Sequence, residues 1–482
     1  MTKTSLRIGL GLIFVVAWVI QKNIFLNWDV SWLSRLAENL YNNGIDKNNF
    51  FEVNSPMSIY IYLPVVFINK LFLIGKVNSF MGYLFICAAL SLWMCWSFLK
   101  KITTDWLAKV GLLFLAVIML LLPSSQFGQR EHIGLILIIP YLFSVIAFLQ
   151  NKSIRWLSAI SVGVLAAIGF SIKPFFIVTF AMIELYCIYY RRDFFAWFRM
   201  ESLVIISGMV SYLLSIWFLQ PGYFSEVIPL ARQYYYLSTR STWDVYLYDL
   251  CFLYCLFSLV VLLALQKKNN IFANVLSLAV MGFLIAYLLQ GVPAYYRILP
   301  AFSLSILLMW IVFSEMRALL IVALIFPIYC LVDENENALW FKKVGYFNEI
   351  IAYMDKNLVE GSSYFISTAV PFPEVDYVDN KKIELNSSAP LPFWWLTGLM
   401  LKEKNPNAED KNKFINKLAD ILDTKKPEFV WVDKRIYLHQ EYQLFDYLGS
   451  FSKNIQFNHV WKNYSYTDSV YFFDIYKRIS PV

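Results

Sequence analysis

A small set of charged residues stands out in this 482-residue chain, because only 16% of its residues are charged. Asp29 follows the first apolar segment, and the run "GQREH" places Arg130 and Glu131 side by side before another one. Lys173 and Arg297 each interrupt a further apolar stretch. A carboxylate can accept a proton from a hydroxyl, and cations can stabilise a departing phosphate. Together these residue types predict group transfer from an anionic, lipid-held phosphate donor to a hydroxyl acceptor.

Each of these residues also has a structural explanation. Asp29 begins "DVSWLSRLAENL", which has apolar residues at helical spacing, so it could be a helix N-cap. The charges of "GQREH" lie at a helix boundary, where long side chains reach water at little cost. Lys173 is different, because Pro174 predicts a helix start there and a helix N-terminus disfavours a cation. An anion would be attracted by both the helix N-terminus and the lysine.

The elements that position these residues are membrane-spanning helices. Hydrophobic residues make up 59% of the chain, and its charged fraction is well below the roughly 25% of soluble proteins. The net charge of +7 therefore does not indicate a nucleic-acid partner. The six cysteines all lie in apolar segments, where packed free thiols are expected. Twelve apolar runs occur near 5–22, 57–75, 79–98, 106–122, 133–149, 156–170, 175–190, 201–219, 247–265, 271–290, 298–314 and 318–332.

The positive-inside rule is violated if all twelve runs cross the membrane. The run 57–75 is the best candidate for a segment that does not cross. Its uninterrupted part, 57–68, would span about 18 Å as a helix, against a hydrocarbon core of about 30 Å. Eleven crossings then place the N-terminus in the cytoplasm and the C-terminus outside. The basic residues that become cytoplasmic are Lys3, Arg7, Lys100, Lys101, Lys152, Arg155, Arg191, Arg192, Lys267, Lys268 and Arg317.

Two domains are expected: a membrane domain at 1–332, with a first external loop at 23–78, and an external domain at 333–482. In the second, helical patterns at 344–358 and 408–423 alternate with β-rich runs at 363–368, 427–433 and 469–478. This alternation predicts a small α/β domain.

The chain resembles the GT-C superfamily of polyprenyl-phosphate-dependent glycosyltransferases, which includes aminoarabinose transferases and protein O-mannosyltransferases. It is most similar to the bacterial RgtA/B/C/D-like group. "NWDVSWLSRLAENLYNNG" resembles that group's first external loop with its early acidic residue, and "NSP" its turn. "GQREH", "SIKP" and "AYYRILP" resemble its later external motifs. The resemblance implies an inner-membrane protein of the GT-C fold with periplasmic juxtamembrane helices.

The resemblance also implies residue roles. Asp29 would be the catalytic base and Glu131 a second acidic group. Sugar contacts or metal ligation would involve Glu52, Asn54 and His132. The lipid phosphate would be held by Arg130, Lys173 and Arg297, with Tyr296 beside them.

The substrates implied by the resemblance are a polyprenyl-phosphate sugar and a glycan, lipid or protein hydroxyl. Val30 stands where many relatives have a second acidic residue, which leaves divalent-metal dependence and sugar identity open. Three alternatives are a lipid-linked sugar flippase or transporter, an O-antigen-ligase-like enzyme and a membrane receptor. A transporter would have charged residues in the middle of its helices, whereas the crossings here are nearly free of them. An O-antigen-ligase-like enzyme would have its large external loop between two late helices.

Overall fold

The computed structural model describes residues 2–45, 52–235, 243–265, 270–314, 316–344, 347–359, 362–367, 384–385, 408–438 and 441–479. Its membrane part consists of α1 (Lys3–Lys22), α2 (Trp28–Asn43), α3 (Met57–Tyr60), α4 (Leu63–Phe72), α5 (Lys76–Ile102), α6 (Asp105–Leu120), η1 (Ser124–Gln126), α7 (Arg130–Leu149), α8 (Trp156–Ile172), η2 (Pro174–Phe176), α9 (Ile177–Arg191), η3 (Phe194–Trp197), α10 (Met200–Leu219), η4 (Tyr223–Val227), α11 (Ile228–Leu230), η5 (Ala231–Tyr235), α13 (Trp243–Leu247), α14 (Leu250–Leu265), α15 (Ile271–Leu289), α16 (Tyr295–Val312) and α17 (Arg317–Val344).

The chain is a multi-pass α-helical membrane protein, as predicted. Among the described residues, eight helices are long and apolar enough to cross a membrane: α1, α5, α7, η2 with α9, α10, α15, α16 and α17. The other three expected crossings are the shorter helices α6, α8 and α14, of 16, 17 and 16 residues. Helix α7 is central, because 94% of its apolar window is buried, whereas 17% is buried in α1 and α10. The "GQREH" charges therefore begin the most enclosed helix.

The run 57–75 is two short helices, α3 and α4, separated at Ile61 and Tyr62. Helix α4 has 10 residues and is about 15 Å long, which is too short to span a bilayer. It packs against α2 and α5 and leaves Phe67, Leu71 and Phe72 exposed. The structure thus agrees with a helix that lies at the membrane interface.

Three of the hydrophilic segments whose basic residues the positive-inside rule groups, at 100–101, 151–155 and 189–193, meet at one end of the bundle. Lys101 Nζ donates to Ser153 O at 2.9 Å, and Arg191 Nη1 donates to Asn151 Oδ1 at 2.6 Å. The expected external breaks meet at the other end, about 30 Å away along the 20 residues of α7. Lys267 and Lys268, which are also predicted to be cytoplasmic, lie outside the described residues.

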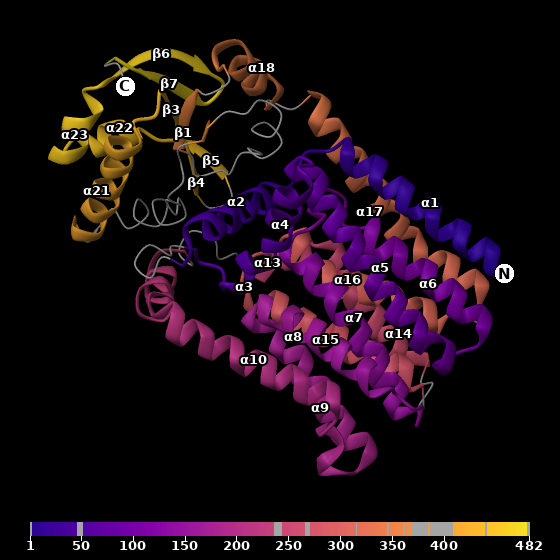
Figure 1. Cartoon of the computed structure of the whole chain (residues 1–482). Coiled ribbons are helices and arrows are strands. Elements are labelled where there is room, and N and C mark those ends of the chain that lie inside the picture. The colour runs from indigo at the N-terminus through magenta and orange to yellow at the C-terminus, as the bar shows by residue number, and fades with distance from the viewer. Residues whose placement is uncertain are drawn as a thin grey trace.

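The C-terminal part forms the predicted α/β unit beyond one end of the helical bundle (Figure 1). Its sheet has five strands in the order β2 (Glu384–Leu385), β1 (Ser363–Ser367), β3 (Phe429–Asp433), β7 (Phe473–Arg478) and β6 (Tyr464–Val470). Strand β1 pairs in parallel with β2 and β3, whereas β7 pairs antiparallel with β3 and β6. The remaining elements are α18 (Phe347–Asn357), α21 (Ala408–Lys425), the hairpin of β4 (Arg435–Leu438) and β5 (Glu441–Leu444), α22 (Tyr447–Phe451) and α23 (Ile455–Trp461).

Helix α17 connects the two parts without a break from Arg317 to Val344. The division of the chain at residues 332 and 333 therefore falls inside a helix, and the domain limits stay a prediction. The apolar crossing leads directly into the α/β unit through this helix.

Candidate active site

Asp29 lies in the first turn of α2, and Asn27 rather than Asp29 caps the helix. The Asn27 side chain accepts a hydrogen bond from the Asp29 N–H at 2.9 Å, so the N-cap alternative for Asp29 is wrong. Because Asn27 satisfies the helix end, the Asp29 carboxylate faces α7 instead. Its Oδ2 accepts from Arg130 Nη2 and from Gln129 Nε2, each at 3.2 Å. The side chain is 28% exposed and so reachable from solvent.

Arg130, Glu131 and His132 of "GQREH" point to three different partners. Arg130 contacts Asp29, whereas Glu131 Oε1 accepts from Lys173 Nζ. Successive residues of a helix point about 100° apart, which explains this divergence. The sequence places Arg130 and Glu131 together, and the structure uses them in separate ion pairs.

Both ring nitrogens of His132 are engaged by the backbone. Nδ1 accepts from the Gly128 N–H at 2.8 Å, and Nε2 donates to Met119 O at 2.7 Å. This pattern requires the neutral imidazole with its proton on Nε2. Contact with a sugar or a metal would break one of these hydrogen bonds, so the geometry favours a structural role in the turn before α7.

Lys173 lies between α8 and η2, and Pro174 begins η2 as expected. Its ammonium donates to Glu131 Oε1 and to Gln290 Oε1, and it lies 5.7 Å from the centre of the Tyr296 ring. The pKa of the Lys173 ammonium is lowered to about 7, and burial is the largest cause.

Nearby charges act on that pKa in both directions. The Glu131 carboxylate raises the pKa of Lys173 and opposes the effect of burial. The guanidinium groups of Arg130 and Arg297 lower it further. Arg130 contacts Asp29, and the adjacent Glu131 contacts Lys173, so the start of α7 joins the two parts of the site.

Gln290 joins the two late cations. Its side-chain oxygen accepts from Lys173, and its backbone oxygen accepts from Arg297 Nη1 at 3.3 Å. Arg297 Nε also donates to Tyr296 Oη at 2.9 Å, and its guanidinium lies 5.3 Å from that ring. The sequence reasoning missed Gln290 because it is uncharged, although it begins the external run "QGVPAYYR".

Lys173 and Arg297 open into a pocket of about 930 Å³, a volume that includes space open to solvent. The described lining contains these two cations and Arg232, with no carboxylate. Apolar walls come from Phe175, Ile228 and other residues of the segments after α8 and α10. A cationic pocket with apolar walls can bind an amphiphile with an anionic head. Arg232 was missed because nothing in its local sequence distinguishes it from a solvated loop cation.

Glu52 and Asn54 belong to the loop that borders this pocket. Glu52 Oε2 accepts from Trp32 Nε1 at 2.8 Å, and Oε1 accepts from the Asn54 N–H at 3.0 Å. Asn54 lines the pocket, and Ser55 Oγ donates to Ile172 O at 2.7 Å. Glu52 thus ties the loop to α2, and a role in sugar contact stays a prediction for both residues.

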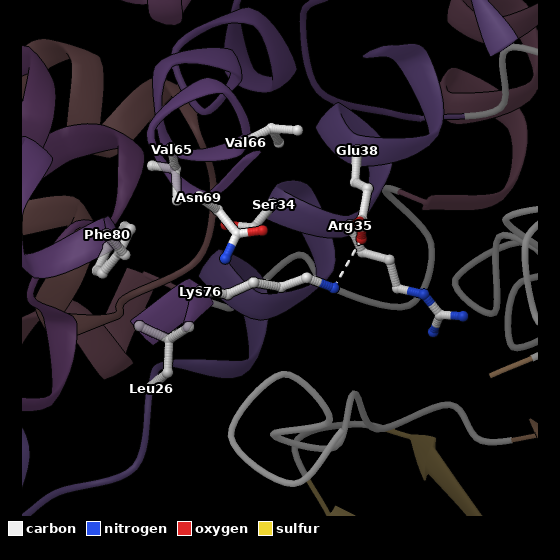
Figure 2. A pocket seen from close by; sticks show the side chains of 9 residues that line it. All are labelled: Leu26, Ser34, Arg35, Glu38, Val65, Val66, Asn69, Lys76 and Phe80. Carbon is white, nitrogen blue, oxygen red and sulfur yellow. Dashed lines mark hydrogen bonds and ion pairs between the residues drawn. The ribbon is translucent and has the colours of Figure 1, made fainter. Parts of the chain in front are cut away.

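Two further pockets border α2 and the segment before it. One, of about 380 Å³, lies between α2, α4 and α5. Figure 2 shows its Lys76–Glu38 ion pair, of 2.7 Å, which ties α2 to the start of α5. The other pocket, of about 790 Å³, is lined by the segment before Asp29, by η1 and by α17, and it includes Phe25, Trp28 and Glu334.

Several buried polar atoms near Asp29 have no hydrogen-bond partner among the described protein atoms. They are Gln129 Oε1, Arg130 Nε, Arg130 Nη1 and Glu131 Oε2. Buried charged groups are normally paired, because desolvation without a partner is costly. The described ranges hold no group of three or more His, Cys, Asp or Glu residues arranged for a metal ion. The cysteines are free thiols, five of them buried.

The fold was compared with known proteins. The chain matches the crystal structure of ArnT from Cupriavidus metallidurans in the apo state, with a TM-score of 0.58 over 99% of this chain and 98% of that chain, at 10% identity. ArnT from the same organism bound to undecaprenyl phosphate gives 0.57 over 98% of both chains, also at 10% identity. The chain has the GT-C fold. The predicted fold class is thus confirmed.

The archaeal oligosaccharyltransferase from Archaeoglobus fulgidus, in its apo form, is a weaker match. Its TM-score is 0.44 at 10% identity, over 88% of this chain and 69% of that one. No protein-family model matches the chain. No curated protein sequence matches it significantly.

Proposed function

We propose that this protein is a membrane glycosyltransferase that moves a sugar from a polyprenyl-phosphate donor to an acceptor hydroxyl on the periplasmic side. The observation that carries the proposal is the pocket lined by Lys173, Arg297 and Arg232, which the start of α7 joins to the Asp29 carboxylate through the Glu131–Lys173 and Arg130–Asp29 ion pairs. The GT-C fold supports it, as does the undecaprenyl phosphate bound to the ArnT neighbour.

In the proposed reaction, the cations act on the donor phosphate and Asp29 acts on the acceptor hydroxyl. The cations hold the donor phosphate and stabilise the negative charge that develops on it. Asp29 accepts the proton of the acceptor hydroxyl, whose oxygen forms a bond to the anomeric carbon as the carbon–oxygen bond to the phosphate breaks. Polyprenyl phosphate leaves without protonation, and attack from the opposite face inverts the anomeric configuration.

Glu131 has a positioning role in this scheme. Its carboxylate is fully buried, its Oε1 engages Lys173, and the side chain lines neither the cationic pocket nor the acceptor pocket. By holding the ammonium beside Gln290, it keeps Lys173 directed at the pocket. In this proposal Glu131, the second acidic group of the resemblance, acts through Lys173.

The pocket of about 790 Å³ beside Asn27 and Trp28 is the proposed acceptor site. Aromatic rings and amide groups suit a sugar, whose faces are apolar and whose edges donate and accept hydrogen bonds. Glu334 lines this pocket, and the described lining contains no cation. This charge pattern favours an acceptor glycan without a phosphate at the bound unit.

The proposed location is the bacterial inner membrane, with a cytoplasmic N-terminus and a periplasmic C-terminal domain. The support is the grouping of basic breaks at one end of the bundle. A Leu73→Cys variant without native cysteines tests it, because Leu73 is 88% exposed beside the site end. An impermeant thiol reagent should label it from outside, and a Lys152→Cys variant only after permeabilisation. The reverse pattern would contradict the orientation.

The activity itself is tested by mass spectrometry of envelope glycans from cells with and without the gene. Loss of one sugar, restored by the wild-type gene but not by Lys173→Ala, is the expected result. Purified protein should bind undecaprenyl phosphate, and Lys173→Ala and Arg297→Ala should each weaken that binding. Unchanged glycans together with unchanged binding in both variants would exclude the proposal.

The flippase or transporter alternative has less support. Among the described crossings, α9 carries Glu184 in its interior, but this carboxylate is paired with Arg199. The pair lies towards the end of the bundle opposite the cationic pocket. A transporter would move the lipid-linked sugar without altering it, so product analysis separates the two functions.

A further inference from the structure

The segment that carries Arg232 is anchored in the core of the C-terminal domain. Tyr234 is fully buried in a hydrophobic cluster built from α21, β3, α22, α23 and β6. Leu230 packs against the same cluster. Arg232 lies between these two anchors and lines the cationic pocket. The pocket therefore contains one cation whose backbone is held by the C-terminal domain rather than by the membrane helices.

The segment that leads to Asp29 has an anchor of the same kind. Phe25 packs against a second cluster of the C-terminal domain, which includes Trp431 and Ile475. Lys342 reinforces this contact, since its Nζ donates to Ile24 O at 3.1 Å and lies 5.1 Å from the centre of the Phe25 ring. Asp29 follows four residues later, in the first turn of α2.

The two anchors lie on opposite faces of one strand. Val430 and Val432 of β3 belong to the cluster that holds Tyr234, whereas Phe429 and Trp431 belong to the cluster that holds Phe25. Successive side chains of a strand point to opposite faces of its sheet, so this alternation places the two clusters on either side of β3. Strand β3 lies inside the sheet, between β1 and β7.

We propose that the C-terminal sheet is a positioning element of the active site, with Tyr234 holding Arg232 at the donor phosphate and Phe25 holding the Asp29 segment at the acceptor. This inference rests on the proposed function and assigns a task to the external domain within it. Because both anchors share β3, the sheet fixes the distance between a phosphate-binding group and the catalytic carboxylate. The membrane part fixes Lys173 and Arg297 and holds the Asp29 carboxylate through Arg130, and the sheet adds a hold on the Arg232 and Asp29 segments that is common to both.

Binding of undecaprenyl phosphate to the purified full-length chain tests the Tyr234 anchor. Tyr234→Ala should weaken binding about tenfold, close to the effect of Arg232→Ala, because both changes remove one charge-assisted contact. Tyr234→Phe should bind as the wild type does, since the ring is kept. The double variant Arg232→Ala/Tyr234→Ala should bind no more weakly than Arg232→Ala alone, because Tyr234 acts through Arg232.

A matched control separates positioning from loss of stability. Phe457 of α23 is buried in the same cluster, outside the Arg232 segment. Phe457→Ala should lower thermal stability about as much as Tyr234→Ala does, yet leave undecaprenyl phosphate binding unchanged. Wild-type binding by Tyr234→Ala, additive losses in the double variant, or equal loss in Phe457→Ala would each overturn the proposal.

Ile475→Ala removes part of the cluster that Phe25 packs against, without changing a residue that lines the acceptor pocket, and it tests the second anchor with the opposite readout. It should leave undecaprenyl phosphate binding unchanged while reducing sugar transfer to envelope glycans in cells, because it acts on the Asp29 segment. Weakened undecaprenyl phosphate binding, or unaltered sugar transfer, would overturn the proposed anchoring of the Asp29 segment. If Lys173→Ala and Arg297→Ala bind normally, the proposed function itself fails; if they bind weakly while Tyr234→Ala does not, only the positioning role fails.

Discussion

The protein has two buried charge clusters, one at each end of its helical bundle, and they differ in how completely their polar atoms are paired. At the end away from the pocket, Glu184 Oε1 accepts from Arg199 Nη2 at 2.9 Å, from Tyr141 Oη at 2.6 Å and from Ser202 Oγ at 2.9 Å. Arg199 also donates to Glu201 Oε1 at 3.0 Å. Of these side chains, only Glu184 Oε2 lacks a partner among the described protein atoms.

The cluster around Asp29 is less complete. Arg130 makes one contact to Asp29, and two of its guanidinium nitrogens are buried without a partner among the described atoms. A buried charge costs free energy unless it is paired and hydrogen-bonded. The paired cluster therefore fits a structural role, and the incomplete one fits a site that a substrate completes. Burial of charge alone does not distinguish the two.

The largest expected effect comes from Asp29→Asn. This change removes the proton acceptor and keeps the shape, so sugar transfer should fall by about 10²- to 10⁴-fold while undecaprenyl phosphate still binds. Glycan mass spectrometry and a binding assay on the same variant measure the two properties. The counterpart Glu184→Gln should leave transfer per folded molecule unchanged. Full transfer by Asp29→Asn would remove this residue from the chemistry.

Replacing each arginine by methionine, in separate variants, tests the difference between the two charge clusters. Arg199→Met leaves Glu184 and Glu201 buried without their cation and should lower stability by about 3–5 kcal/mol. Arg130→Met should cost less stability, because fewer contacts are lost, but should reduce transfer by at least about tenfold through Asp29. Thermal unfolding and transfer are measured for both variants. Equal losses of stability and activity in both would remove the distinction between the clusters.

The pH dependence of donor binding reports on Lys173, whose pKa lies at about 7. The protonated ammonium binds the phosphate better than the neutral amine does, so affinity is highest below pH 7. Above that pH, binding requires uptake of a proton, and affinity should fall up to about tenfold per pH unit until the pKa of the complex is reached. A phosphodiester donor analogue is the suitable probe, because it does not titrate in this range. Lys173→Arg should abolish the dependence, and an unchanged profile would assign it to another group.

The smallest effect is expected where the site is supported from a distance. Glu38→Gln breaks the half-exposed ion pair with Lys76 that ties α2 to α5. Such pairs contribute about 0–1 kcal/mol, so transfer should change by no more than about fivefold. A loss as large as that of Asp29→Asn would mean that this contact belongs to the active site.

The sequence predicts the helices well, because each depends on a local apolar run. The run 57–75 was expected as a single non-crossing helix, and its break at Ile61 and Tyr62 was not predicted. The β-rich runs correspond to β1, β3 and β7, whereas β2, β4, β5 and most of β6 were not predicted. Capping was predicted less well. Asp29 and Asn27 are both good N-cap residues. Which of them caps α2 depends on the contacts of Asn27 with Ser125 and Gln126, about 100 residues away in the sequence.

The site could be predicted only where its residues are unusual in their surroundings. Lys173 and Arg297 stand out as cations in apolar segments, and the structure brings them to one pocket. Arg232 and Gln290 do not stand out, because a cation or an amide in a loop is ordinary. Glu131 and His132 were grouped with Arg130 by adjacency, whereas helix geometry directs the three side chains to different partners.

The turn before α7 depends on one residue without a side chain. Gly128 has a φ of 79°, and a Cβ atom there would lie 1.9 Å from the Phe80 ring. Its N–H is bound to His132, and its carbonyl accepts from Tyr62 Oη at 2.8 Å. A side chain at this position would displace Phe80 and Leu84 of α5 and would strain the backbone of the turn. Because Arg130 and Glu131 begin α7 two residues later, both ion pairs of the site depend on this glycine.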